Sequence, residues 1–203
     1  MRRLMISLMA LVLCAGVLFN SVPANAAPVQ WSVESGGNGH WYEAVYTGSP
    51  TSYISWDDAK AGAEAPGGYL ACITSKEENT FVFNLITDPK FWYNDINNYC
   101  EGPWLGGHDA TGHSDWQWIS GELWSYSNWE SHQPSSPGSE FCLNYVGHGS
   151  NNIADTWNDL LGGPQTLGYV VEYNVPEPST LALLGAGAIS LLAYVWRRRK
   201  PAA

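Results

Sequence analysis

Apolar and polar positions divide this chain into two apolar ends and a mixed middle. One apolar run extends from Leu4 to Phe19, and a second, of sixteen residues, extends from Leu181 to Trp196. Between the two ends, Ala27 to Asn174 shows the short apolar spacings that are typical of helices and strands. The length of this middle part suits one domain with its own core.

Two helices are predicted in the first half of the domain. Ser55 can cap a helix that ends at Gly67-Gly68, and its apolar face is formed by Trp56, Ala59 and Ala63. A second capping box begins at Ser75, and the helix ends before Pro89, with an apolar face formed by Phe81, Val82, Leu85 and Ile86. Both predicted helices therefore lie in the first half of the domain, before its long loops.

Short strands are predicted on both sides of these helices. Apolar alternation or short buried runs indicate five of them, at Trp31 to Val33, His40 to Thr47, Tyr69 to Ile73, Trp104 to Gly107 and Leu167 to Tyr173. A first strand that pairs with the last would bring the two ends of the domain together. The region from His108 to Asp159 is rich in tryptophan and loops, and long loops in a compact domain are usually functional.

The first 26 residues are predicted to be a secretory signal peptide. Arg2 and Arg3 precede the apolar run, and Ala24-Asn25-Ala26 supplies the small residues that a signal peptidase needs. Cleavage after Ala26 also removes Cys14.

The last residues, 175–203, carry a second signal. Pro176-Glu177-Pro178 precedes the run from Leu181 to Trp196, and Arg197 to Lys200 closes it. A run of this length is slightly short for a stable membrane span, and a plain single-span anchor is the alternative interpretation. The order of these parts resembles the PEP-CTERM sorting signal of Gram-negative bacteria. That resemblance implies a transient transmembrane helix, removal by an exosortase, and release or attachment at the cell surface.

Charge within the domain narrows the possible partners. Eighteen Asp and Glu stand against Lys60, Lys76 and Lys90, with no Arg, which gives a formal charge of −15. Such a surface repels nucleic acid and anionic lipid, and it suits cations and neutral ligands. The domain also contains ten tryptophans, a residue that stacks well on sugar rings.

The three cysteines left after signal removal are Cys72, Cys100 and Cys142. Secretion permits disulfides, and an odd count allows at most one bridge within the chain. We expect one such disulfide, with the pair left open. The cysteine spacing fits no zinc pattern, and the nearby histidines His108 and His113 are interpreted as surface residues.

The stretch from Asn128 to Cys142 is the candidate binding loop. It begins at Trp129, is stiffened by Pro134 and Pro137, and carries three oxygen donors, at Gln133, Ser135 and Glu140. Oxygen ligands on a loop are what a calcium ion takes. The alternative is an ordinary solvated loop.

Several short sequence motifs, taken in their order along the chain, resemble those of the C-type lectin-like domain. They cover about His40 to Tyr173 and comprise Trp104-Leu105-Gly106-Gly107, Trp116 to Trp129, Gln133-Pro134-Ser135, Glu140 two residues before Cys142, and Trp157-Asn158-Asp159. Each motif alone is weak evidence for the family, but the motifs together in this order are specific. The resemblance implies an α+β fold with two helices, short antiparallel sheets and a long loop region.

The same resemblance implies a site for Ca²⁺ and sugar. The implied metal ligands are Gln133, Ser135, Glu140, Asn158 and Asp159. All of these except Ser135 are also the implied carbohydrate contacts, because vicinal sugar hydroxyls fill the ion's remaining positions. Ser135 stands where the family has Asn or Asp, and Pro134 is expected to follow a cis peptide bond.

The chain departs from the family at its usual bridges and at an auxiliary site. Ala63 and Val171 stand where the family joins the first helix to the last strand by a disulfide, so we expect a packed join there. Cys142 begins the second usual bridge, but its partner position near Gly162 is not cysteine. The auxiliary metal site near Asp109 is expected to be incomplete, since its acidic partners are replaced, at His113 and Ser136.

Three kinds of function follow from these features. The first is a secreted or surface calcium-dependent lectin for a glycan such as an exopolysaccharide. The second is a structural or protein-binding module with the same fold and no calcium or sugar. An enzyme is not expected: the acidic pair Asp155 and Asp159 could suggest a glycoside hydrolase, but no nucleophile elbow, His-based triad or zinc motif is present.

Overall fold

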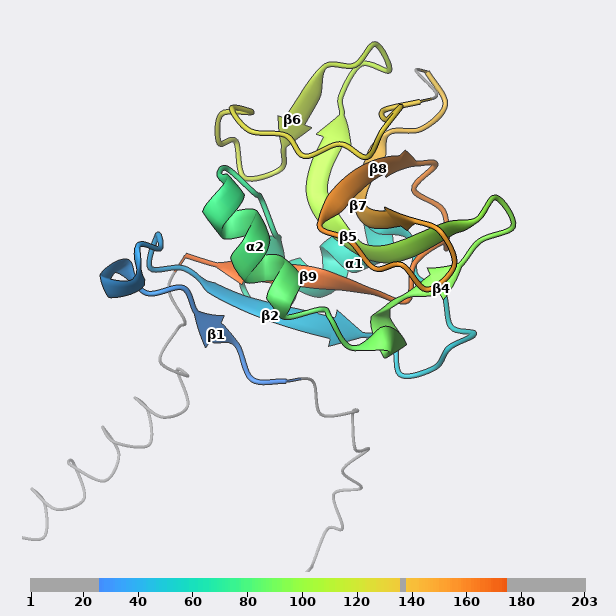
Figure 1. Cartoon of the computed structure of the whole chain (residues 1–203). Coiled ribbons are helices and arrows are strands. Elements are labelled where there is room, and N and C mark those ends of the chain that lie inside the picture. Colours follow the sequence, from blue (N-terminus) through green and yellow to red (C-terminus); the bar gives the residue numbers. More distant parts are fainter. Residues whose placement is uncertain (1–25, 136–137, 175–203) are drawn as a thin grey trace, which may run out of the picture.

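The computed structural model describes residues 26–135 and 138–174, and these form two helices around one connected sheet (Figure 1). The elements are, in chain order, β1 (Val29–Gln30), η1 (Val33–Ser35), β2 (Trp41–Tyr46), α1 (Trp56–Glu64), β3 (Tyr69–Leu70), α2 (Lys76–Asn84), η2 (Pro89–Phe91), β4 (Tyr93–Asn94), β5 (Tyr99–Asp109), β6 (Trp116–Trp118), β7 (Cys142–His148), β8 (Thr156–Leu160) and β9 (Gly168–Tyr173).

Both predicted helices are confirmed, and each begins at the predicted cap. The Ser55 hydroxyl accepts a hydrogen bond from the Asp58 N–H, and the Ser75 hydroxyl accepts one from the Glu78 N–H. Such caps satisfy N–H groups that have no partner inside the helix. The second helix ends earlier than its apolar pattern suggests, at Asn84.

The strands form one mixed sheet in the order β1-β2-β9-β5-β7-β8. The predicted pairing of first and last strands is confirmed, because β2 and β9 run antiparallel from Trp41 opposite Tyr173 to Tyr46 opposite Gly168. The α+β class is therefore confirmed. The expected short antiparallel sheets are instead one connected sheet, since a parallel pairing of Trp104 with Tyr169 joins β5 to β9.

Some strand boundaries differ from the expectation. The first strand is β1, and Val33 lies in a 3-10 helix instead of a strand. The predicted strand from Trp104 to Gly107 is the central part of the much longer β5. The loop-rich region is also less irregular than expected, because it contains β6, β7 and β8.

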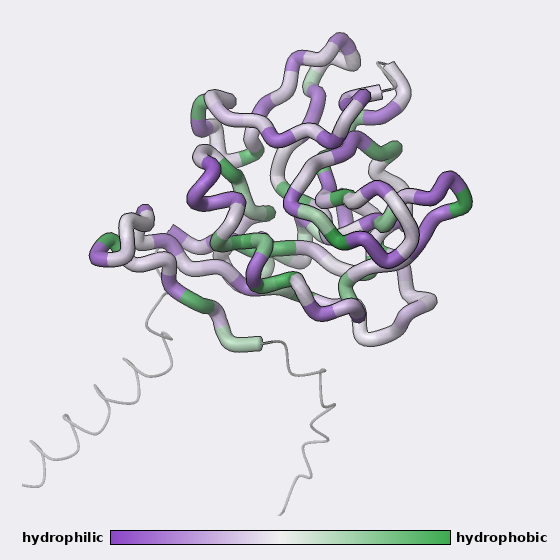
Figure 2. The backbone as a smooth tube through the Cα atoms, in the orientation of Figure 1, coloured by the Kyte–Doolittle hydropathy of each residue, from purple (hydrophilic) through white to green (hydrophobic). Residues whose placement is uncertain are grey.

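The core lies between the helices and the sheet. Trp104 and Trp157 are fully buried, and Trp104 also donates its indole N–H to the Ile54 carbonyl at 2.9 Å. Ala63 and Val171 lie in the same buried cluster, so the join between α1 and β9 is packed as expected. Figure 2 shows apolar stretches through α2 and the neighbouring strands, whereas the loops above β5 and β8 are mostly neutral or hydrophilic.

The expected disulfide is absent from the described residues. Cys72, Cys100 and Cys142 are all free there, so the expected nonstandard bridge is not confirmed. Cys72 and Cys100 lie in the core as small apolar residues, each almost completely buried. Cys142 instead packs its sulfur against Gly162, the position that lacks the second cysteine.

The two predicted export signals, residues 1–26 and 175–203, lie outside the described residues except for Ala26. This includes the apolar run from Leu181 to Trp196. Within residues 26–135 and 138–174, no helix is long and apolar enough to cross a membrane.

Candidate functional site

The candidate loop lies alongside β8. The Glu130 N–H donates to the Trp157 carbonyl at 2.8 Å, and the Trp157 N–H donates to the Asn128 carbonyl at 2.8 Å. Further along the loop, the Ser135 N–H donates to both carboxylate oxygens of Asp159, at 2.9 and 3.2 Å. These backbone bonds tie the loop to the strand that carries two of the implied ligands.

A cluster of tryptophans supports the base of this loop. Ring centroids are 4.4 Å apart for Trp118 and Trp124 and 4.8 Å apart for Trp116 and Trp129, and the buried Trp157 packs edge-on against Trp129. Such aromatic pairs add stability beyond the area that they bury. Trp129 therefore anchors the loop, as its position in the sequence indicates.

Glu140 lies at the end of the loop, where the chain enters β7. The N–H of its neighbour Phe141 donates to the Leu160 carbonyl at 2.9 Å, so Glu140 is brought to the end of β8. The Ser135 hydroxyl lies 3.4 Å from a Glu140 carboxylate oxygen. Ser135 thus contacts both carboxylate residues, Glu140 and Asp159, through different atoms.

Gln133 and Asn158 present side-chain oxygens that lack hydrogen-bond donors. The Gln133 Oε1 and Asn158 Oδ1 atoms are buried, and neither has a partner among the described residues. The predicted cis bond between Gln133 and Pro134 is confirmed. A buried amide oxygen without a donor is costly, and a cation in contact with it removes that cost.

The residues present fit a calcium ion. Two amide oxygens that lack donors lie in the same loop and strand as two carboxylates, Glu140 and Asp159. This set of hard oxygen ligands is the chemistry that Ca²⁺ takes. The Ser135 side chain is exposed and carries no charge, so it is the weakest donor of the five.

Sequence reasoning missed two buried polar residues behind the site, Glu101 on β5 and Asn144 on β7. Asn144 stands opposite Asn158 in the antiparallel pair of β7 and β8, and its Nδ2 donates to Glu101 Oε2 at 2.7 Å. Burial raises the pKa of Glu101 to about 7; the nearby Asp95 and Glu140 charges also raise it, while hydrogen bonds from Asn144 and Asn158 lower it. The signal in the sequence was a polar residue in the middle of each of two apolar strands.

The loop after β5 is organised around the Asp109 carboxylate. Asp109 accepts backbone N–H bonds from Thr111, Gly112, Ser114 and Asp115, at 2.8 to 3.2 Å. Burial raises the pKa of Asp109, but these backbone hydrogen bonds together lower it by more. The pKa of Asp109 therefore lies below its ordinary value. The carboxylate is therefore used to close its own loop. His113 is exposed, as expected, whereas His108 is only partly exposed and its Nδ1 atom is buried.

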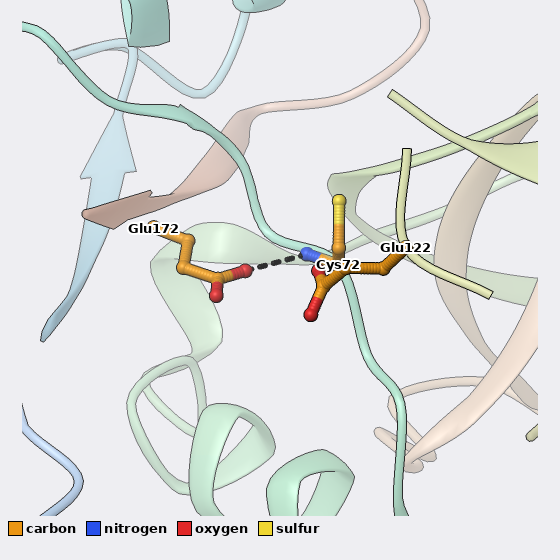
Figure 3. Close-up of side chains that lie close together, drawn as sticks. All are labelled: Cys72, Glu122 and Glu172. Atoms are coloured by element: carbon orange, nitrogen blue, oxygen red, sulfur yellow. Dashed lines mark hydrogen bonds between the residues drawn. The ribbon is translucent and has the colours of Figure 1, made fainter. Parts of the chain in front are cut away.

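A second polar cluster lies at β9, which β5 and β7 separate from β8 in the sheet. The Cys72 sulfur and carboxylate oxygens of Glu122 and Glu172 lie within 4.8 Å of one another (Figure 3). Buried Glu172 accepts a hydrogen bond from the Cys72 N–H at 2.9 Å and lies 2.6 Å from His40 Nδ1. Burial raises the pKa of the Cys72 thiol well above its usual range, so the thiol stays protonated. The cluster is a satisfied polar network that joins β2 to β9.

Comparison with known families gives two matches. The Lectin C-type domain matches residues 52–161, and the PEP-CTERM protein-sorting motif matches residues 174–200. Both predicted resemblances are thereby confirmed, and the first covers the binding loop and β8 together.

Curated relatives of similar sequence include two animal proteins. The perlucin-like protein of Mytilus galloprovincialis is 34% identical over 118 residues, which are 57% of this chain and 68% of that protein. C-type mannose receptor 2 of Mus musculus is 33% identical over 100 residues, which are 49% of this chain but only 6% of the receptor. The likeness to the receptor is thus a likeness to a small part of it.

Solved structures show the same fold at lower identity. Herring type II antifreeze protein has a TM-score of 0.54 and 23% identity, covering 68% of this chain and 94% of that one. A calcium-independent type II antifreeze protein has a TM-score of 0.51 and 21% identity, covering 74% and 95%. At these identities the likeness concerns the fold alone.

Proposed function

The chain belongs to the Lectin C-type domain family, and from that membership we propose that its domain is an exported, calcium-dependent carbohydrate-binding module. One observation carries the proposal. The amide oxygens of Gln133 and Asn158 are buried and have no donor among residues 26–135 and 138–174, and they lie in the same loop and strand as the carboxylates of Glu140 and Asp159. A divalent cation satisfies both the oxygens and the charges.

Each residue of the site has a proposed role. Gln133 and Asn158 contribute amide oxygens, and Glu140 and Asp159 contribute carboxylates. Ser135 closes the loop on Asp159 through its backbone N–H and offers its hydroxyl as the fifth donor. A bound calcium ion would supply open coordination positions for two sugar hydroxyls. The amide N–H groups and carboxylates around it can then donate to and accept from those hydroxyls.

The composition and the export signals support a neutral extracellular glycan as the ligand. The domain's charge of −15 repels anionic polymers but not a neutral sugar chain. The PEP-CTERM match supports recognition by an exosortase and a place at the cell surface or in the extracellular matrix. We therefore propose a glycan of the surface, such as an exopolysaccharide, as the partner of this domain.

A second candidate function is a structural or protein-binding module that uses the fold without calcium or sugar. The observation that favours it is the Asp159 carboxylate, which already accepts the Ser135 N–H on both oxygens. The fold also occurs in a calcium-independent type II antifreeze protein.

Calorimetry separates the two candidates. The purified domain, residues 27–174, is titrated with Ca²⁺ and then applied to a glycan array with and without chelator. We expect calcium binding and array signals that chelator abolishes. Asp159→Asn should lose both. Asp115→Asn, which removes an exposed carboxylate of a neighbouring loop, should keep both and serves as the matched control.

Two outcomes would favour the second candidate. One is the absence of calcium binding by the wild-type domain. The other is a set of glycan signals that persists in chelator and in Asp159→Asn.

A further inference from the structure

Glu101 is a buried carboxylate on β5 without a cationic partner. Glu101 is 3% exposed, and it belongs to none of the ion pairs found among residues 26–135 and 138–174. Removing a carboxylate from water without an opposite charge costs several kcal/mol. The chain offsets this cost with hydrogen-bond donors, and the identity of those donors indicates what Glu101 does.

The donors are side-chain amides from the two strands next along the sheet. Asn144 on β7 donates its Nδ2 to Glu101 Oε2 at 2.7 Å and to the Tyr145 carbonyl at 2.8 Å. Asn158 on β8 stands opposite Asn144, and hydrogen bonding from its side chain is among the causes that lower the pKa of Glu101. Glu101 thus accepts the Asn144 amide directly and also interacts with the amide of Asn158, a proposed calcium ligand.

An amide that is held in this way can point its oxygen in only one direction. The nitrogen and oxygen of an asparagine side chain lie on opposite arms of one planar group, and only the nitrogen can donate to a carboxylate. When Glu101 engages the nitrogen, the oxygen must face away from it. The Asn144 and Asn158 Oδ1 atoms are indeed buried, and neither has a donor in the part of the chain that the structure describes. The alternative orientation would place oxygen against carboxylate, which is repulsive.

We propose that Glu101 is a positioning residue, which fixes the Asn158 side chain with its oxygen toward the calcium site before calcium arrives. This inference rests on the proposed function, because it assigns Glu101 a role at that same site. It also explains why a polar side chain occupies the interior of β5. Residues that orient metal ligands affect metal affinity without contacting the metal.

The first test uses Glu101→Gln, which keeps the shape and removes the charge. The new amide can present its own N–H₂ to Asn158, so the Asn158 side chain loses its fixed orientation. Calcium affinity, measured by titration calorimetry, should fall about 10- to 100-fold. The melting temperature in chelator should not fall, since a buried unpaired charge has been removed. A merely structural role predicts the reverse, a less stable apo domain with unchanged affinity.

A rescue experiment separates orientation from loss of charge. Adding Asn158→Asp to Glu101→Gln moves the carboxylate from position 101 to position 158. A carboxylate offers an oxygen in both directions, so its orientation no longer matters. The double variant should therefore recover most of the calcium affinity. Failure of the rescue, with affinity as low as in Glu101→Gln alone, would overturn the positioning role.

Glu172→Gln is the matched control. Glu172 is equally buried and also hydrogen-bonded, but it belongs to the polar network around His40 and Cys72. This variant should leave calcium affinity unchanged. If it weakens calcium binding as much as Glu101→Gln does, the effect is a general one of buried charge and the inference fails.

A calcium-free readout keeps this inference distinct from the function on which it rests. In apo wild type, the side-chain N–H₂ signals of Asn144 and Asn158 should show the slowed hydrogen exchange of bonded amides, and Glu101→Gln should change both. If wild type binds calcium and Glu101→Gln binds it equally tightly, the positioning role is wrong while the proposed function stands. If wild type binds no calcium, the proposed function fails and this role fails with it.

Discussion

Single residues decide how the core and the site are held. Trp104 is fully buried and donates its indole N–H to the carbonyl of Ile54, a residue outside the binding loop. Replacing it with alanine should lower the free energy of unfolding by about 3–5 kcal/mol, because a large cavity remains. Denaturant unfolding measures this, and Leu123→Ala, at a side chain that is 80% exposed, is the control. A Trp104→Ala protein with normal stability and lost ligand binding would contradict the core assignment.

The pair of His40 and Glu172 predicts a pH dependence of stability. The hydrogen bond to Glu172 raises the pKa of His40 above 6.5, and burial raises the pKa of Glu172 above 4.5. Both groups hold a proton more tightly in the folded than in the unfolded chain. Their contribution to stability is therefore present at low pH and is lost as pH rises through the two raised pKa values.

Melting temperatures in chelator between pH 4 and 8 test this dependence. Those of the wild type should fall across the range, and the fall should be smaller in His40→Gln and in Glu172→Gln. Equal pH profiles for all three proteins would show that this network does not control the titration. Those melts are made without calcium, so that calcium binding does not contribute.

At the scale of elements, Cys142 at the start of β7 faces Gly162 in the turn after β8, so one half of a possible disulfide is missing. An ideal Cβ placed at Gly162 lies 2.8 Å from Cys142 Sγ and 3.7 Å from its Cβ, within the usual Cβ–Cβ range of bridges, about 3.5–4.5 Å. Gly162→Cys should therefore form a bridge with Cys142. The closed loop should add about 3 kcal/mol, less about 1–2 kcal/mol for a side chain at the positive φ of this position.

Thiol counts and melting curves check this bridge. The denatured, non-reduced variant should keep Cys72 and Cys100 free and lose the Cys142 thiol, and reductant should lower its melting temperature. Gly162→Ala carries the same backbone strain without the sulfur, so it should be less stable than wild type. A free thiol at Cys142 in the oxidised Gly162→Cys protein would contradict the predicted geometry.

Element by element, local signals were readable from the sequence and long-range ones were not. Both helices were predicted because Ser55 and Ser75 form their caps with residues three positions away. The start of β5 was missed because Glu101 interrupts its apolar pattern, and the reason for that interruption lies on two other strands. Gln133, Glu140, Asn158 and Asp159 were proposed as ligands from short motifs, whereas Asn144 became visible only through its register opposite Asn158.

For the whole molecule, the export signals predict a mature chain shorter than the full sequence of 203 residues. A signal peptidase should remove residues 1–26, and an exosortase should cut near the Pro176-Glu177-Pro178 motif within the matched residues 174–200. Intact mass of the native extracellular protein should show the loss of both ends. Material that still carries Leu181 to Trp196 at steady state would contradict the sorting interpretation and favour a plain anchor.

Calcium is expected to stabilise the domain as a whole. Glu140 and Asp159 both contact Ser135, so their charges lie close together in the calcium-free domain. Calcium should relieve this repulsion and tie the loop to β8. Replacing either carboxylate with its amide should weaken calcium binding, and the apo form should be no less stable than wild type.

The most direct test of this account is the melting temperature of the wild-type domain in calcium and in chelator, beside Asp159→Asn. At a calcium concentration about 100 times the dissociation constant, binding adds about 2.7 kcal/mol of stability, which raises the melting temperature of a domain this size by about 5–10 °C. We predict that rise for the wild type and little or none for Asp159→Asn. Equal wild-type melting temperatures in calcium and in chelator would contradict the calcium-dependent site.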